Sequence, residues 1–82
     1  MKAQILGMGC PKCNLLEKNT RSAIEQLGID VTVEKITDME TITEMGMLVS
    51  PGFAIDGELV TSGRVLSADR ITRLLTERHN HG

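Results

Sequence analysis

The sequence has almost no aromatic residues: Phe53 is the single aromatic side chain among 82 residues, and neither tryptophan nor tyrosine occurs. A core must therefore be built from aliphatic side chains, which supply almost all of the 40% hydrophobic fraction. An excess of positive charge is absent too, since nine basic and eleven acidic residues leave a net charge of −2. Without a basic stripe or a set of stacking aromatic rings, the composition disfavours nucleic-acid binding.

Long hydrophobic runs are also missing. No stretch approaches the ~20 apolar residues that a membrane-spanning helix needs, and residues 1–7 lack the apolar segment of a secretory signal peptide. We therefore expect a cytoplasmic monomer without a membrane partner. A chain of 82 residues suits one compact domain. We assign this domain to residues 1–78 and expect residues 79–82 to form a disordered tail.

The first part of the sequence predicts a strand, a helix and a second strand. Residues 2–6 form a short strand that ends at a Gly-Met-Gly turn, and Pro11 follows where a helix begins. Apolar residues then repeat at three- and four-residue steps up to Gly28, a typical C-terminal stop. Alternating β-branched residues predict the second strand over residues 29–36.

The next part predicts a short helix and a hairpin. Thr37 and Glu40 have the spacing of a capping box, which would start a helix over residues 38–45. Asp56-Gly57 is a strong two-residue turn signal between two strand segments, 53–55 and 58–61.

The last element predicted is a helix with Ser67 as its N-cap and an apolar face at Ile71, Leu74 and Leu75. The predicted order is therefore β-α-β-α-β-β-α. Two strands joined through a helix are expected to be parallel, with a right-handed crossover, and the hairpin adds an antiparallel pair. The sequence predicts an α/β fold with one mixed, four-stranded sheet covered by helices.

The strongest chemical signal is the motif Cys10-Pro11-Lys12-Cys13. It follows a strand and opens a helix, which is the setting of a redox-active C-x-x-C motif. The unpaired N–H groups and the positive dipole end of the helix stabilise a thiolate at Cys10, and Lys12 adds a positive charge nearby. Two intervening residues bring the sulfurs close enough to bridge. Cys10 can then attack a disulfide, and Cys13 can resolve the mixed disulfide that forms.

Two other interpretations of the cysteines stay open. Packed cysteines without chemistry would not need a proline-started helix flanked by Gly7 and Gly9, which we expect to let the backbone turn tightly. The run from Gly7 to Cys13 also resembles the copper-binding loop of heavy-metal-associated domains, and thiolates suit Cu(I), or Zn with further ligands. Those domains run β-α-β-β-α-β and end on a strand, so a Cu(I)/Zn carrier ranks second. Met8 could be a thioether ligand, but methionine more often forms an apolar lip for substrates.

The cysteine motif, together with Ser50-Pro51 at the start of the hairpin, resembles the thioredoxin and glutaredoxin superfamily. The closest resemblance is to the small archaeal and bacterial thioredoxin-like proteins, and it extends over residues 2–75. It implies a thioredoxin-like fold in which Cys10 is the nucleophile and Cys13 the resolving cysteine. It also implies a cis peptide bond before Pro51, beside the disulfide.

The resemblance implies an activity and its partners as well. The expected activity is that of a dithiol–disulfide oxidoreductase, with protein disulfides as substrates and a thioredoxin-reductase-like enzyme as electron donor. No cofactor is expected beyond the Cys10–Cys13 disulfide itself. Ser50 would present its backbone N–H and C=O to an extended substrate strand. The remaining residues of the expected substrate-binding set are Met8, Pro11, Lys12 and Pro51.

The motif departs from the family pattern in several places. Gly9 stands where typical thioredoxins have tryptophan, and Pro11-Lys12 replaces their Gly-Pro. The strand over residues 2–6 lacks the buried acid that assists the resolving thiol in the family. Gly63 is the one glycine that remains of the pair found in glutathione-binding glutaredoxins, which argues against glutathione as the reductant.

Overall fold

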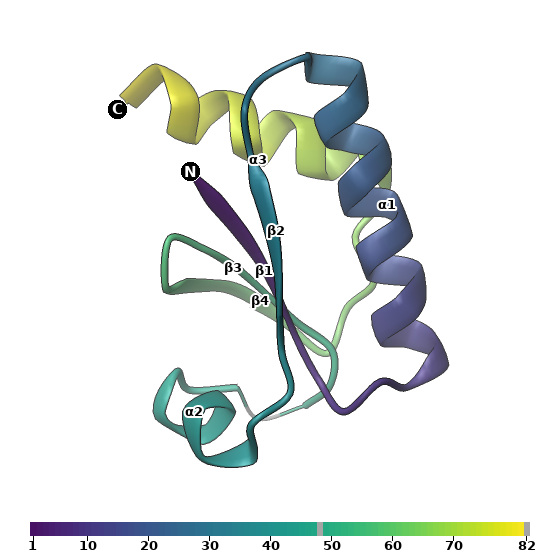
Figure 1. Cartoon of the computed structure of the whole chain (residues 1–82), viewed down its shortest axis with the longest axis vertical. Helices are drawn as coiled ribbons and strands as arrows, with labels where there is room; N and C mark the ends of the chain where they lie inside the picture. Colours follow the sequence, from purple (N-terminus) through teal and green to yellow (C-terminus); the bar gives the residue numbers. More distant parts are fainter. Residues whose placement is uncertain (48, 82) are drawn as a thin grey trace.

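Four strands form one mixed sheet with helices on both faces in the computed structural model of the chain (Figure 1), which describes residues 1–47 and 49–81. The elements follow one another as β1 Lys2–Leu6, α1 Pro11–Leu27, β2 Thr32–Ile36, α2 Met39–Glu44, β3 Gly52–Ile55, β4 Glu58–Ser62 and α3 Ala68–His81. This is the β-α-β-α-β-β-α order that the sequence predicts. None of the described helices is long and apolar enough to cross a lipid bilayer.

The strands lie side by side in the order β2-β1-β3-β4. Strand β1 is parallel to β2, to which α1 connects it, whereas β3 is antiparallel to both β1 and β4. The register between β1 and β3 pairs Leu6 with Gly52. The end of β1 that leads to the cysteines therefore lies beside the start of β3, which follows Ser50 and Pro51.

The sheet divides the apolar side chains into two clusters, because successive residues of a strand point to opposite faces. One face packs against α1 and α3 through a core that includes Ala3, Ile5, Leu16, Phe53, Ile55, Ile71 and Leu75. On the other face, Ile42 of α2 packs against Leu6 and Ala54. The Phe53 side chain is fully buried, and truncating such a side chain to alanine costs about 3–5 kcal/mol.

Both long helices begin at residues that the sequence marks for this purpose, and α1 also ends at one. Pro11 is the first residue of α1 and Cys10 is its N-cap. Gly28 ends α1 in the left-handed conformation, with φ at 65°, a conformation that glycine adopts without a steric penalty. The Oγ of Ser67 accepts a hydrogen bond at 3.2 Å from the N–H of Arg70, so Ser67 caps α3.

The short helix α2 starts differently from the prediction. Its N-cap is Asp38, so the capping box predicted at Thr37 is wrong, and the helix is slightly shorter than residues 38–45. The Asp38 carboxylate accepts hydrogen bonds from the N–H of Thr41 at 3.2 Å and from its hydroxyl at 2.7 Å. These two bonds favour Asp38 over Thr37 as the cap.

Strand β3 begins one residue earlier and β4 ends one residue later than predicted, and two other boundaries differ more. Strand β2 begins at Thr32 rather than at residue 29, because Thr32 pairs with Lys2, the first residue of β1. Helix α3 continues to His81, so residues 79–81 are helical and do not form the expected tail. Neither glycine nor proline interrupts this helix, and Arg78 ties it to Glu58 of β4 through a 2.6 Å ion pair. Gly82, the last residue of that tail, lies outside the described residues.

Candidate active site

The two cysteines lie at the turn from β1 into α1. Cys10 has an extended backbone (φ −69°, ψ 162°), and its Sγ accepts a hydrogen bond at 3.3 Å from the N–H of Cys13. The two Sγ atoms are 2.6 Å apart, and both residues are free thiols. Since sulfurs at this spacing need only small side-chain rotations to form a bond, the pair can cycle between dithiol and disulfide.

The two thiols have different environments and therefore different acidities. The thiol of Cys13, followed by its backbone N–H, donates hydrogen bonds that hold the pKa of Cys10 below the usual value of a cysteine. Burial raises the pKa of Cys13, and its bond to the Cys10 sulfur raises it further. Cys13 has an exposed fraction of 5%, whereas Cys10 is half-buried. Cys10 is therefore the thiol that ionises first and that a substrate can reach.

Gly7 provides the space that the buried thiol occupies. A Cβ atom on residue 7 would overlap the Sγ of Cys13. Gly9 has a φ of +83°, whereas Gly7 is not among the residues with positive φ. Both glycines lie in the bend between β1 and α1, as expected. Gly9 adopts the positive φ there, and Gly7 in addition allows the close approach of Cys13.

The segment before β3 passes close to Gly7 and to the buried thiol of Cys13. A Cβ on Gly7 would overlap the Cys13 Sγ. The same Cβ position lies 3.9 Å from the Ser50 Oγ, so Ser50 is near the buried thiol. The Ser50–Pro51 peptide bond is cis, Pro51 is fully buried and Ser50 is exposed. The fold thus brings Ser50, which precedes Pro51, close to the buried thiol of Cys13 from a distant part of the sequence.

The other residues named from the sequence lie around Cys10 on the outside of the molecule. The Met8 side chain is 64% exposed, and Pro11 and Lys12 are exposed in the first turn of α1. Val49, which is 61% exposed beside Ser50, was not among the residues predicted from the sequence. Ser62, which is hydrogen-bonded to Val49, was not among them either. No local pattern could have found Ser62, because its role depends on the pairing of β3 with β4.

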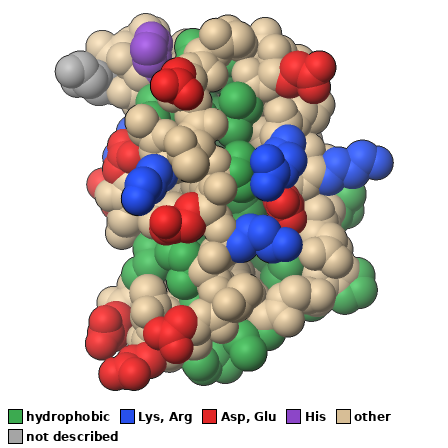
Figure 2. Space-filling model, viewed as in Figure 1, with side chains coloured by type: hydrophobic (Ala, Val, Ile, Leu, Met, Phe, Trp, Pro, Cys, Tyr) green, Lys and Arg blue, Asp and Glu red, His purple; other side chains and the backbone are tan. Residues whose placement is uncertain are grey.

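One ion pair, between Glu17 and Lys35, links the helix that carries the thiols to the edge strand β2. Glu17 lies one turn beyond Cys13. Its Oε2 is 2.9 Å from Nη2 of Arg21 in the same helix, and its Oε1 is 3.2 Å from Nζ of Lys35 in β2. Hydrogen bonds from Arg21 and Lys35 lower the pKa of Glu17. Figure 2 shows Lys and Arg side chains over the region where α1 and β2 meet, and acidic side chains over α2. Acidic side chains also lie among these Lys and Arg side chains, so the two signs are mixed there, whereas the region over α2 is acidic.

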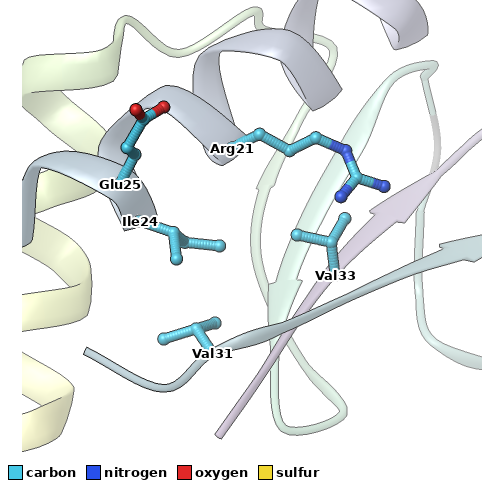
Figure 3. A pocket seen from close by; sticks show the side chains of 5 residues that line it. All are labelled: Arg21, Ile24, Glu25, Val31 and Val33. Carbon is cyan, nitrogen blue, oxygen red and sulfur yellow. The ribbon is translucent and has the colours of Figure 1, made fainter. Parts of the chain in front are cut away.

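A hollow of about 220 Å³ lies between the second half of α1 and the chain that enters β2 (Figure 3). Ile24, Val31 and Val33 form its apolar wall, with Arg21 and Glu25 beside them. None of these residues belongs to the thiol site. Among the side chains that the structure describes, no cluster of three or more histidine, cysteine or acidic residues is placed to hold a metal ion.

Comparisons with known proteins place this arrangement in a family. A family model described as "Thioredoxin domain" matches residues 1–76. A thioredoxin from Methanothermobacter thermautotrophicus is 50% identical over 76 residues, which is 93% of this chain and 99% of that protein. A thioredoxin from Methanocaldococcus jannaschii is 43% identical over 68 residues, 83% of this chain and 78% of that protein. A solved structure described as "Structure of a malarial protein" has a TM-score of 0.65 at 9% identity, covering 94% of this chain and 97% of that one.

The structural likeness at 9% identity concerns the fold alone. This chain has the thioredoxin fold, with a mixed sheet in the order β2-β1-β3-β4. Its dithiol lies at the start of α1. The family match and the two archaeal relatives go further, and the chain belongs to the thioredoxin family. It is accordingly a thioredoxin-like dithiol–disulfide oxidoreductase.

Proposed function

We propose that this oxidoreductase exchanges disulfides of protein substrates, with Cys10 as the nucleophile and Cys13 as the resolving thiol. The observation that carries the proposal is the contrast between the two sulfurs. The sulfur of Cys10 is accessible at a helix N-terminus and accepts hydrogen bonds, whereas that of Cys13, 2.6 Å away, is buried. This geometry makes Cys10 the better nucleophile and keeps Cys13 protonated until it is needed.

The exchange proceeds in two substitutions at sulfur. The Cys10 thiolate attacks one sulfur of the substrate disulfide, that S–S bond breaks, and the released substrate thiolate takes a proton from solvent. Cys13 then loses its proton and attacks the Sγ of Cys10, which releases the second substrate thiolate. The substrate gains two electrons, and the protein is left with a Cys10–Cys13 disulfide.

The segment around Ser50 is the proposed place for the substrate chain. Among the described residues, neither the N–H nor the C=O of Ser50 has a hydrogen-bond partner, so both are available to an extended peptide. The exposed side chains of Met8 and Val49 offer apolar contacts. Pro11 and Lys12 complete the surface around Cys10.

Replacing Cys13 with serine tests the proposed roles. Cys13→Ser leaves the attacking thiol intact but removes the resolving one, so mixed disulfides at Cys10 should accumulate in a cell lysate. The matched control is the double variant Cys10→Ser/Cys13→Ser, which should trap nothing. If Cys13→Ser forms no adducts and the wild-type protein reduces no protein disulfide, the proposed function is wrong.

The alternative of a Cu(I) or Zn carrier receives less support. Strand β2 leads into helix α2 in the order β-α-β-α-β-β-α, whereas the domains that share the metal-binding loop run β-α-β-β-α-β. Two neighbouring thiols can still ligate a soft cation. Titrating the reduced protein with Cu(I) against a strong chelator separates the two functions. Tight stoichiometric binding would favour the carrier, and weak binding with a readily cycled disulfide would favour the oxidoreductase.

The electron donor we propose is a thioredoxin-reductase-like flavoenzyme, with the protein acting as a cytoplasmic monomer. Reduction of the Cys10–Cys13 disulfide by such an enzyme, followed through the consumption of its nicotinamide substrate, tests the donor. A disulfide that this reductase leaves oxidised, but that glutathione reduces, would overturn this part of the proposal.

A further inference from the structure

The segment that carries Ser50 and Pro51 is held by hydrogen bonds from the end of β4. The Ser62 Oγ accepts a hydrogen bond from the Val49 N–H at 3.2 Å and donates one to the Val49 C=O at 3.0 Å. One residue further on, the Gly63 N–H donates to the Pro51 C=O at 2.8 Å. A single hydroxyl therefore binds both polar backbone groups of the residue that precedes Ser50.

This arrangement continues the pairing of β3 and β4 beyond the last residue pair of the ladder. The register pairs Gly52 with Ser62, and Pro51, the residue before Gly52, has no N–H to donate. At Val49 the Ser62 side chain, rather than a backbone group, forms the hydrogen bonds with the Val49 N–H and C=O. Serine suits this position because a hydroxyl can donate and accept a hydrogen bond at the same time.

Packing between Val49 and Gly63 supports the same placement. A Cβ on Gly63 would lie 3.2 Å from both the Cβ and the Cγ1 of Val49, which is tighter than ordinary contact. Because residue 63 has no side chain, the Val49 side chain can lie close to the backbone of Gly63. Gly63 also has a φ of +79°, a conformation that favours glycine.

Ser50 lies between Val49 and Pro51, two residues whose backbone groups are held by hydrogen bonds. The backbone groups of Val49 are bonded to Ser62, and the C=O of Pro51 is bonded to Gly63. Within the described part of the chain, the N–H and C=O of Ser50 remain the unbonded backbone groups of the segment. The orientation of these two groups therefore depends on how firmly Val49 and Pro51 are held.

We infer that Ser62 is a positioning residue, whose hydroxyl fixes the Val49 backbone so that Ser50 presents its N–H and C=O to a peptide substrate. The inference rests on the proposed function. The bonds of Ser62 are exposed, so water can replace them when the hydroxyl is removed. Removing it should therefore leave the protein folded but allow the segment to move, and a peptide must then order that segment as it binds.

Single-turnover reduction of insulin by the reduced protein tests this role. Ser62→Ala should raise the half-saturating insulin concentration about tenfold, which corresponds to about 1.4 kcal/mol, and leave the limiting rate unchanged. Reduction of hydroxyethyl disulfide, which has no peptide strand to pair, should not change. Ser62→Thr keeps the hydroxyl and should restore the wild-type concentration dependence.

The matched control is Ser67→Ala, which removes the hydroxyl that caps α3. It should lower the thermal midpoint but leave the half-saturating insulin concentration unchanged. Amide hydrogen exchange gives a second readout: exchange at Val49 should become faster in Ser62→Ala and stay unchanged in Ser67→Ala. These two measurements distinguish a lost anchor from a general loss of stability.

Two results would overturn the inference. The first is a wild-type half-saturating insulin concentration in Ser62→Ala, and the second is an equal loss of activity toward hydroxyethyl disulfide. In either case, reduction of insulin by the wild-type protein would still support the proposed function. A wild-type protein that reduces hydroxyethyl disulfide but not insulin would instead overturn the choice of substrate, and with it the role of Ser62.

Discussion

Replacing Gly7 with alanine should disturb the dithiol through a single steric conflict. The added Cβ would overlap the Cys13 Sγ but would lie 3.5 Å from the Cys13 Cβ, which is ordinary contact. Gly7 is not among the residues with positive φ, so its backbone accepts alanine. The conflict is therefore with the sulfur alone. Forcing one extra methyl group into such a packed position costs about 1–3 kcal/mol.

A double-mutant cycle isolates this conflict. In a Cys13→Ala background the overlapping sulfur is gone, and Gly7→Ala should then be neutral or stabilise the fold by about 0.4–1 kcal/mol, because alanine restricts the unfolded chain. The free energy of unfolding can be measured by urea denaturation under reducing conditions. The effect of Gly7→Ala should differ between the two backgrounds by more than about 1 kcal/mol.

The matched control for this cycle is Gly9→Ala. A Cβ on Gly9 would meet nothing within 4 Å, but the φ of +83° strains any other residue. Gly9→Ala should therefore destabilise the protein equally with and without the Cys13 sulfur. If Gly7→Ala also costs the same free energy of unfolding in both backgrounds, the steric explanation is refuted.

Two further predictions follow from the acidities of named groups. Alkylation of reduced Cys10 by iodoacetamide should show a titration midpoint below that of an ordinary cysteine, because hydrogen bonds lower the pKa of Cys10, and Cys13 should titrate above it; equal midpoints would contradict this. Asp38→Ala should lower the thermal midpoint at neutral pH more than Thr37→Ala, since Asp38 is the cap of α2. Bonds from Thr41 lower the pKa of Asp38 in the folded state, so its contribution is present above the unfolded pKa and disappears as the pH falls through the folded pKa. A difference between the two variants that persists in strong acid would contradict this assignment.

The sequence predicted most of the secondary structure because the signals were local. Pro11 and Gly28 bound α1. Asp56 and Gly57 form the β3–β4 turn with φ values of 50° and 86°, as their residue types indicate. The cap of α2 was assigned wrongly because Thr37 and Asp38 are both good capping residues. The two hydrogen bonds from Thr41 distinguish them, and these bonds exist only once the helix is built.

The part of the active site that lies in the first turn of α1 could be predicted from the sequence. The spacing of Cys10 and Cys13, and the proline between them, were enough to place a thiolate at a helix N-terminus. The resemblance to a known family added Ser50 and Pro51. The extent of α3 was underestimated because residues 79–82 were expected to be loose, whereas α3 continues to His81.

The amino-acid sequence by itself determined an aliphatic core, the order of the elements and a cysteine pair at the start of a helix. Each of these depends on composition or on contacts within a few residues of the chain. Only the tertiary structure decided that residue 7 must lack a side chain and that Ser62 binds Val49. These features arise where β1 pairs with β3 and β3 with β4. Such pairing brings together residues that are far apart in the sequence, so no local pattern predicts their contact.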